Sequence, residues 1–421
     1  MKVLFANTND SSGGAARAAM RIMRGVQQSG VEAQMFVKDK YSKSPDVIPL
    51  SAYAPSSNWL SDIFKWVIQK FKNRYHMFKW HPYKRTRQNV FMSDLRHTDI
   101  HGALQRLDYD IVHLHWINNR FLDIRKLAKI HKPIVWTLHD SWPFCGVCHL
   151  PMDCKRYERH CGACPMLGSH NEKDLAYEIF EKKLEVYKDL ELHIVTPSRW
   201  LAECVRKSVL LGKFPIMVIP NCINTELYQP LNKQDACRLL GLEQDKKYIL
   251  FGAMQATKDQ NKGFDLLLKS LNLLQDRNVE LIVYGTNENL NIYDIPMPVH
   301  SLGYINDDKQ MSLIYNAADV SIVPSRSENL SNTIMESLSC GTPVVAFNIG
   351  GNSDMIDHQQ NGYLANELDC EDMAHGIQWC LEHKEENTLW ENAREKVMAN
   401  YTIQIVSEQY NQLYQSLLKK S

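Results

Sequence analysis

Two glutamates in the C-terminal half of the chain have the chemistry and placement expected of a site for a phosphorylated, hydroxyl-rich ligand. Glu328 and Glu336 are separated by seven residues in a stretch that follows the apolar run Val320–Val323 and enters a helix. Residues 330–332 fall at the start of that helix, where unpaired backbone N–H groups and the helix dipole favour a phosphate. Carboxylate oxygens before and after this position suit the hydroxyls of a sugar and a ribose. A capping loop followed by an exposed glutamate is the alternative for each acidic residue taken alone.

A loop that contains two lysines precedes another helix in the same half of the chain. Lys258 and Lys262 follow the expected strand Tyr248–Gly252 and lead into the expected helix Phe264–Leu274. A lysine at such a place is a natural counter-charge for a diphosphate leaving group, because a fixed positive charge stabilises the negative charge that develops there. A solvated surface lysine is the alternative for either residue taken alone.

In the N-terminal half, a glycine pair and a histidine are candidates to line a ligand site. Gly13 and Gly14 stand between an expected strand and an expected helix. Glycine lets the backbone approach a ligand closely, and the start of the helix favours negative charge. His113 and His115 fall on the same side of a second strand, because side chains alternate along a strand. We expect His115, at the end of that strand, to face a ligand, and His113 to be a structural histidine.

These candidates need a scaffold, and the apolar pattern predicts an α/β one. Short apolar runs alternate with helix-length amphipathic stretches, as in parallel sheets covered by helices on both faces. Two consecutive series of runs predict two doubly wound, Rossmann-like domains whose loops gather at the carboxyl ends of their strands. The join is expected near the proline turn at residues 220–222. The expected strands are Val3–Ala6, Ala33–Val37, Ile111–His115, Ile134–Leu138 and Leu192–Thr196, then Tyr248–Gly252, Leu281–Tyr284, Val320–Val323 and Val344–Phe347.

Six ordered features of the chain resemble the glycosyltransferases of family 4, which have the GT-B fold. Order and spacing hold from about Thr196 to Ile356. The features are Ile219-Pro220-Asn221, Lys262-Gly263, Pro324-Ser325, Glu328 with Glu336, the Gly-x-Pro-Val-Val strand at 341–345, and Gly350-Gly351.

The resemblance implies two domains that face a cleft. An acceptor-binding domain would cover residues 1–222 and a nucleotide-sugar-binding domain residues 223–398, with a helix over 399–421 that packs back on the first. It also implies a hexosyltransferase that retains the anomeric configuration, uses a UDP- or GDP-sugar donor and needs no metal for catalysis.

The same resemblance assigns roles to residues of the donor site. It gives Lys262 to the donor diphosphate, Glu328 to the transferred sugar and Glu336 to the nucleotide ribose. Tyr304 and Ile305 would lie near the base. The backbone amides expected near phosphate are those of Leu330, Ser331 and Asn332.

One position departs from the family pattern. The family commonly has an arginine after the glycine that ends the first strand of this domain, and here the residue is Ala253. Either Lys258 substitutes from a longer loop or Lys262 carries the diphosphate largely alone. In the other domain, the resemblance places Gly13 and Gly14 at the cleft and has His115 position the acceptor hydroxyl or the transferred sugar.

A cysteine cluster follows His139-Asp140 directly. Five of the eleven cysteines lie within residues 145–164. Two Cys-x2-Cys pairs flanking a fifth cysteine have the density of a structural zinc site, which four thiolates, or three with a histidine, would complete. Reduced thiols in a tight loop and an iron–sulfur cluster are the alternatives. The five residues are Cys145, Cys148, Cys154, Cys161 and Cys164.

A basic, aromatic segment covers residues 59–87. It contains eight lysines or arginines, one aspartate and eight aromatic residues, with apolar residues on one helical face. This composition predicts an interfacial anchor on an anionic membrane, which would suit a lipid-diphosphate-linked acceptor. A helix that packs its aromatic face on its own domain is the alternative. No nucleic-acid partner is expected, since no recognition module accompanies the basic patch.

Composition is consistent with a soluble globular protein of two domains. The chain has 421 residues, and its 48 lysines and arginines balance 48 aspartates and glutamates. No signal peptide or spanning segment of about 20 apolar residues is expected, which predicts a cytoplasmic protein on the inner face of the membrane. The function expected is transfer of a sugar to a glycan acceptor in cell-surface polysaccharide biosynthesis. The alternatives are a soluble transferase or phosphorylase for a small sugar or sugar phosphate, and a non-catalytic nucleotide-sugar-binding scaffold.

Overall fold

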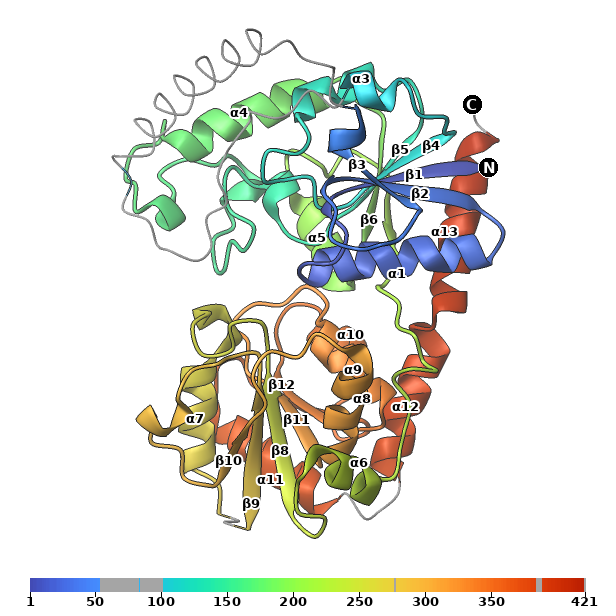
Figure 1. Ribbon diagram of the computed structural model, residues 1–421. Coiled ribbons are helices and arrows are strands. Elements are labelled where there is room, and N and C mark those ends of the chain that lie inside the picture. The colour runs from blue at the N-terminus through green and yellow to red at the C-terminus, as the bar shows by residue number, and fades with distance from the viewer. Residues whose placement is uncertain (54–82, 84–100, 276–277, 384–387, 420–421) are drawn as a thin grey trace, which may run out of the picture. The chain divides into compact units, whose positions relative to one another are not determined.

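The protein consists of two compact units, each built on one sheet (Figure 1). The computed structural model describes residues 1–53, 83, 101–275, 278–383 and 388–419. The first unit comprises Met1–Thr196, Ala202–Val218 and Asn411–Ser421, and the second comprises Pro197–Leu201 and Ile219–Tyr410.

The first unit contains a seven-stranded sheet in the order β3-β2-β1-β4-β5-β6-β7. All of its neighbouring strands are parallel. The order reverses between β1 and β4, and open α/β sheets bind ligands outside the carboxyl ends of the strands at such a point. The strands are β1 (Lys2–Asn9), β2 (Glu32–Asp39), β3 (Val47–Pro49), β4 (Ile111–Leu114), β5 (Ile134–Thr137), β6 (Leu192–Thr196) and β7 (Ile216–Val218).

The second unit repeats this plan with a six-stranded parallel sheet in the order β10-β9-β8-β11-β12-β13. Its order reverses between β8 and β11. The predicted α/β class with two doubly wound sheets is therefore confirmed. The strands are β8 (Lys247–Gly252), β9 (Val279–Tyr284), β10 (Val299–Ser301), β11 (Val320–Val323), β12 (Val344–Phe347) and β13 (Gly362–Ala365).

Helices connect the strands and cover the sheets. None of the helices within the described ranges is both long and apolar enough to span a lipid bilayer. The helices are α1 (Gly14–Gln28), α3 (His101–Leu104), α4 (Leu175–Tyr187), α5 (Arg199–Lys207), α6 (Lys233–Leu240), α7 (Phe264–Asn272), α8 (Asp308–Ala317), α9 (Asn332–Ser339), α10 (Asn352–Met355), α11 (Cys370–Glu382), α12 (Thr388–Asn400) and α13 (Ile403–Leu418).

Each face of the second sheet supports its own hydrophobic core. Along β8, Tyr248 and Leu250 pack toward α8, α9 and α12, while Ile249 and Phe251 pack toward α7 and α11. Figure 1 shows α7 on one side of this sheet and α8 and α9 on the other. Because both faces are buried, the central strands are apolar without interruption, which made them recognisable in the sequence.

The strands that the sequence did not predict are the four at the sheet edges, β3, β7, β10 and β13. Each has only three or four residues. Their burial is mixed: Met217 in β7, for example, keeps 44% of its surface exposed. Edge strands are covered on fewer sides, so they need no continuous apolar run and leave a weak signal.

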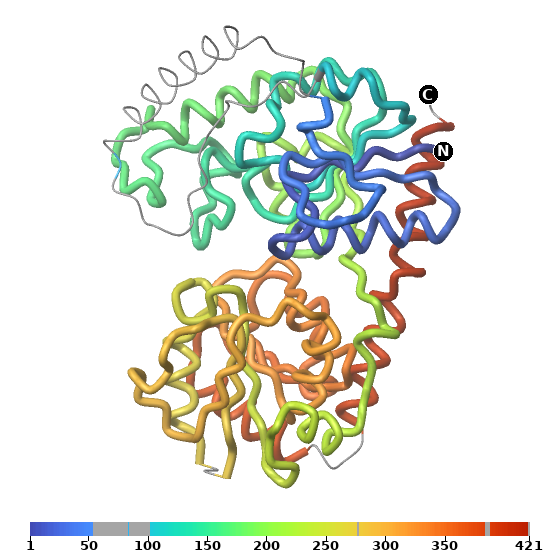
Figure 2. Tube along the Cα trace, in the orientation of Figure 1, coloured from blue at the N-terminus to red at the C-terminus, as the bar shows by residue number. Residues whose placement is uncertain are grey.

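The end of α13 returns to the first unit and packs against its sheet, as the resemblance implied. The hydroxyl of Tyr414 lies 2.7 Å from Nδ1 of the buried His113, whose Nε2 lies 2.7 Å from Oγ1 of Thr137. Figure 2 shows the C-terminal end of the trace beside the N-terminal strand. His113 is thus a core residue bonded on both sides, as expected for a structural histidine.

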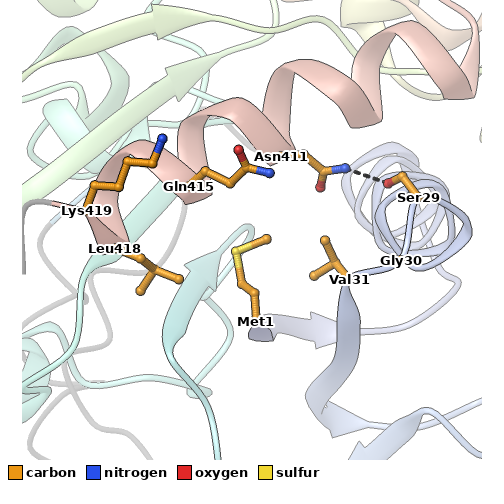
Figure 3. A pocket seen from close by; sticks show the side chains of 8 residues that line it. All are labelled: Met1, Ser29, Gly30, Val31, Asn411, Gln415, Leu418 and Lys419. Carbon is orange, nitrogen blue, oxygen red and sulfur yellow. Dashed lines mark hydrogen bonds between the residues drawn. The ribbon is translucent and has the colours of Figure 1, made fainter.

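A hollow of about 420 Å³ lies beside this contact (Figure 3). Nδ2 of Asn411 donates a hydrogen bond of 2.7 Å to Oγ of Ser29 across one end of it. Both apolar and polar side chains line it. The lining residues are Met1, Ser29, Gly30, Val31, Asn411, Gln415, Leu418 and Lys419.

The cysteine segment folds around a buried lysine. All five cysteines are free thiols, and all but the half-buried Cys154 are buried. The ammonium of Lys183, a residue of α4, donates to the carbonyl oxygens of Trp142, Cys145 and Gly146. It also lies 3.7 Å from the centre of the Trp142 ring. Burial lowers the pKa of Lys183 to about 7.

The basic, aromatic segment at residues 59–87 lies outside the described residues except for Tyr83. The hydroxyl of Tyr83 accepts a hydrogen bond of 3.1 Å from the backbone N–H of Leu175, at the start of α4. The membrane anchor stays a prediction.

Buried histidines should make the protein sensitive to acid. Burial lowers the pKa of His113 well below its ordinary value. Below about pH 6.5 this histidine is therefore protonated in the unfolded chain but stays neutral in the folded one. The free energy of unfolding then falls as the pH drops further. When the pH is lowered from 7.5 to 5.5, the free energy of unfolding should fall in both proteins. The fall should be about 1 kcal/mol smaller in His113→Gln than in the wild type. Equal losses in urea titrations at the two pH values would contradict this.

Lys183 should be a main support of the cysteine segment. Lys183→Met would leave three carbonyl oxygens without their donor, so we expect a loss of roughly 2–4 kcal/mol in unfolding free energy. The neighbouring Lys182 is exposed. Lys182→Met is therefore the matched control and should leave the melting temperature nearly unchanged. A Lys183→Met protein as stable as this control would show that the carbonyl contacts contribute little.

Candidate functional site

The structure brings Lys262 and Glu328 into contact at the carboxyl edge of the second sheet. Nζ of Lys262 lies 2.7 Å from Oε1 of Glu328, although the residues are 66 positions apart. Oγ of Ser325 donates to the same oxygen at 2.8 Å. Burial alone would lower the pKa of Lys262, but the charge of Glu328 and its hydrogen bond outweigh burial and raise it. The lysine therefore carries a stable positive charge at this position.

A second set of bonds fixes the loop of Glu328 to the loop of Lys262. The guanidinium of Arg326 forms two hydrogen bonds with the carboxylate of Asp265, at 2.9 and 2.7 Å. Nδ2 of Asn261 donates to the carbonyl oxygen of Ser327 at 2.9 Å, and the N–H of Arg326 donates to the carbonyl oxygen of Asn261 at 2.8 Å. These bonds lie on both sides of Lys262 in the sequence and directly before Glu328, so they hold the two loops together.

Glycines allow these loops to approach so closely. Gly263 has φ +68°, and a Cβ there would lie 1.9 Å from the carbonyl oxygen of Pro324. Gly350 has φ +52°, and a Cβ there would lie 1.7 Å from the carbonyl oxygen of Glu328. No other residue type fits either position without moving the backbone. The glycine motifs of the sequence therefore have a direct structural reason.

Glu336 occupies a different setting, inside the unit. It lies in α9 with 4% of its surface exposed. The hydroxyl of Tyr315 lies 3.2 Å from its Oε2. A carboxylate this deeply buried must be hydrogen-bonded, because leaving it without partners in the interior is costly.

The start of α9 carries the residues whose backbone N–H groups are predicted to bind phosphate. Ser331 is the N-cap residue, and its side chain makes no capping hydrogen bond. Leu330 is buried and Asn332 is half-buried. In the loop after Gly303, Tyr304 is 50% exposed while Ile305 packs against the core of the unit.

Lys258 does not join Lys262. Its ammonium lies 3.2 Å from Oε1 of Glu288 and its side chain is 67% exposed. Glu288 also accepts hydrogen bonds from the hydroxyls of Thr257 and Tyr293, at 2.6 and 3.1 Å. The two lysines therefore face different carboxylates.

In the first unit, His115 lies at the carboxyl end of β4. Its N–H donates to the carbonyl oxygen of Ala6 at 3.0 Å, and its Nδ1 lies 2.9 Å from Nε2 of His139. Its Nε2 is buried and has no hydrogen-bond partner among the described residues. Burial lowers the pKa of His115 well below its ordinary value and that of His139 to about 4. The pair is therefore neutral at physiological pH, with one ring nitrogen available to a ligand.

Asp140 and Trp116 flank this pair. Nε1 of Trp116 donates to Oδ2 of Asp140 at 2.9 Å, and the N–H of Trp142 donates to Oδ1 at 2.9 Å. Burial raises the pKa of Asp140 to about 6, against the effect of these bonds. Gly13 has φ +87° and precedes α1, which begins at Gly14. No atom lies within 4 Å of a Cβ built at Gly13, so its backbone conformation alone requires glycine.

Several residues of these sites were not predicted from the sequence. Arg326 lies between Ser325 and Glu328, but no spacing rule connects it to Asp265. Tyr315 falls at a core position of α8, where an aromatic residue is ordinary. The hydroxyl partner of a buried acid leaves no local signal in the sequence.

No metal site is evident in the described parts of the chain. No group of three or more histidine, cysteine, aspartate or glutamate side chains there has an arrangement that could hold an ion. The zinc ligands suggested at Cys145, Cys148, Cys154, Cys161 and Cys164 stay a prediction.

Two family profiles match the chain. The profile described as Glycosyltransferase Family 4 matches residues 12–227, which is more than half of the chain. The profile described as Glycosyl transferases group 1 matches residues 245–383.

Curated relatives are also glycosyltransferases. An uncharacterized glycosyltransferase of Methanocaldococcus jannaschii is 25% identical over 288 residues, which is 66% of this chain and 67% of the relative. The UDP-Gal:alpha-D-GlcNAc-diphosphoundecaprenol alpha-1,3-galactosyltransferase of Escherichia coli is 25% identical over 257 residues, or 56% of this chain and 65% of the relative. Other relatives are matched over 59% and 44% of their length. These relatives agree with the profile match and do not identify a substrate for this chain.

Solved structures share the fold. Sucrose-phosphate synthase from Thermosynechococcus elongatus has a TM-score of 0.68 at 19% identity and is covered in full, as is this chain. The HepE protein of Anabaena, solved with UDP and glucose, has a TM-score of 0.64 at 15% identity over 99% of this chain and 100% of that one. With the profile over residues 12–227, the two doubly wound sheets and the glutamate pair of the second unit, the chain belongs to glycosyltransferase family 4 and has the GT-B fold.

Proposed function

We propose that the protein is a retaining, metal-independent hexosyltransferase that moves a sugar from a UDP- or GDP-sugar to a glycan acceptor in cell-surface polysaccharide biosynthesis. The observation that carries this proposal is the Lys262–Glu328 ion pair of 2.7 Å, in which Glu328 lies three residues before Ser331, the N-cap of α9 that makes no side-chain capping bond. A fixed positive charge and helix N–H groups suit a diphosphate, and a carboxylate beside them suits a sugar hydroxyl.

Each charged residue has a separate task in this proposal. Lys262 stabilises the negative charge of the departing nucleoside diphosphate, and the amides of Leu330, Ser331 and Asn332 bind its phosphate oxygens. Glu328 accepts a hydrogen bond from the transferred sugar. The ion pair and the hydrogen bond from Ser325 hold the ammonium and the carboxylate in place, so little reorganisation is needed when the donor binds.

The remaining donor contacts are proposed from the resemblance to family 4. Glu336 accepts hydrogen bonds from the ribose, and Tyr304 and Ile305 lie near the base. Lys258 contributes less to the diphosphate, since it pairs with Glu288 and is largely exposed.

His115 serves the acceptor or the transferred sugar. Its buried Nε2 has no partner among the described residues, which supports a hydrogen bond to a hydroxyl. As the ring is neutral, it orients this hydroxyl and does not supply a positive charge. Gly13 provides open space at the start of α1 for a ligand in the same unit, and Gly14 follows it as the first residue of that helix.

The proposed acceptor is a lipid-diphosphate-linked glycan at the inner face of the cell membrane. The relative from Escherichia coli is named for an acceptor of this kind. The eight basic and eight aromatic residues of the segment 59–87 also support a position at an anionic membrane.

A donor screen tests the proposed reaction directly. One UDP- or GDP-sugar should raise the melting temperature, because a ligand that binds only the folded state stabilises it. The purified protein should then hydrolyse that donor slowly, and the released sugar should first appear in the donor's anomeric configuration by NMR. Inversion at the anomeric carbon, or no stabilisation by any nucleotide sugar, would refute the proposal.

Lysine variants test the charge at the diphosphate. Lys262→Ala should lower kcat by roughly 10²-fold, because it removes the charge that stabilises the leaving group. Lys309→Ala, at an exposed lysine of α8, is the matched control and should behave as wild type. If Lys258→Ala caused the larger loss, the diphosphate role would belong to Lys258 and not to Lys262.

A further inference from the structure

The carboxylate of Glu336 ends a chain of hydrogen bonds that runs through two tyrosines. The hydroxyl of Tyr315 lies 3.2 Å from Oε2 of Glu336, and the hydroxyl of Tyr284 lies 3.0 Å from that of Tyr315. An ionised carboxylate can only accept hydrogen bonds. Tyr315 must therefore donate to Glu336, and the oxygen of Tyr315 accepts from Tyr284.

Both tyrosines are held as donors by their surroundings. Tyr315 is fully buried and Tyr284 is 8% exposed. Burial, followed by the neighbouring hydroxyl of Tyr284 and the charge of Glu336, raises the pKa of Tyr315 well above its ordinary value. The Tyr315 hydroxyl thus keeps its proton at neutral pH and remains a donor.

The position of Tyr284 is fixed by the ends of two strands. Tyr284 is the last residue of β9, and Gly252 is the last residue of β8. A Cβ at Gly252 would lie 2.1 Å from a carbon of the Tyr284 ring, so the ring occupies the space that a side chain would fill. The rings of Tyr284 and Tyr315 meet edge to face, with centres 6.4 Å apart and planes at 82°. The chain of bonds is therefore anchored at the carboxyl edge of the sheet and ends on α9.

We propose that Tyr315, supported by Tyr284, is a positioning residue that fixes the carboxylate of Glu336 to read the hydroxyls of a nucleotide ribose. This inference rests on the proposed function, in which Glu336 binds the ribose. The Tyr315 hydroxyl holds the carboxylate of Glu336 in one orientation. The carboxylate therefore does not have to reorient when a ribose hydroxyl binds. It also rejects a sugar that lacks this hydroxyl, because a buried acceptor would then lose a partner.

The inference predicts a specific loss of discrimination between ribose and deoxyribose. For whichever of UDP and GDP stabilises the protein, we would measure Kd by calorimetry for the nucleotide and for its 2′-deoxy analogue. Tyr315→Phe should weaken binding of the ribonucleotide about tenfold, as expected when one hydrogen bond to a charged group is lost. Binding of the 2′-deoxy analogue should change by less than about twofold, since that ligand gains little from the oriented carboxylate.

Tyr284→Phe provides a second variant, which removes only the outer bond of the chain. It should weaken ribonucleotide binding by about two- to threefold and again leave the deoxy analogue nearly unchanged. This variant keeps the inference testable if Tyr315→Phe fails to fold. The matched control is Tyr187→Phe, because Tyr187 is a buried tyrosine of the first unit whose hydroxyl has no partner among the described residues.

The arms of the experiment separate this inference from the proposed function. If Glu336→Ala weakens ribonucleotide binding while both tyrosine variants match wild type, the positioning role is wrong and the ribose role of Glu336 stands. Equal weakening of ribo- and deoxyribonucleotide by the tyrosine variants would mean a merely structural role and would also overturn the inference. If Glu336→Ala binds as wild type, or neither diphosphate binds at all, the proposed donor site fails and the inference fails with it.

Discussion

The site in the second unit depends on backbone segments that approach one another more closely than any side chain would allow. The loop after β11 contacts the segment after β8 at Gly263 and the segment after β12 at Gly350, where a Cβ would overlap a carbonyl oxygen. β8, β11 and β12 are neighbours in the sheet, so three adjacent strand ends are drawn together. The ion pair between Lys262 and Glu328 depends on this approach, because it brings two loops 66 residues apart close enough to place opposite charges 2.7 Å from each other.

The two units use different electrostatics at their candidate sites. The first keeps His115 and His139 neutral by burial, so it offers hydrogen bonds without net charge. The second unit pairs a lysine with a glutamate, so its candidate site contains charged groups. A reaction in which a diphosphate departs from one substrate and a hydroxyl of another attacks needs both kinds of surface: fixed charge for the leaving group and neutral, directional contacts for the hydroxyl.

The sequence predicted the central strands and the glutamate pair because both have local signatures. Strands buried on both faces are apolar without interruption, and motif spacing identified Lys262, Glu328 and Glu336. It could not predict the four edge strands, which are short and only partly buried. Nor could it connect Arg326 with Asp265, or Tyr315 with Glu336, because those partners meet only through packing between helices and loops. The sequence thus does not reveal the contacts that support Lys262, Glu328 and Glu336.

The contact between Tyr414 and His113 has a consequence for how the chain is made. Tyr414 belongs to a segment of the first unit that follows the whole of the second unit in the sequence. During synthesis, the second unit is therefore translated in full before Tyr414, and His113 lacks its tyrosine partner until then. Completion of the first unit thus depends on residues translated after the whole of the second unit, and until then the unfinished first unit is open to chaperones and proteases.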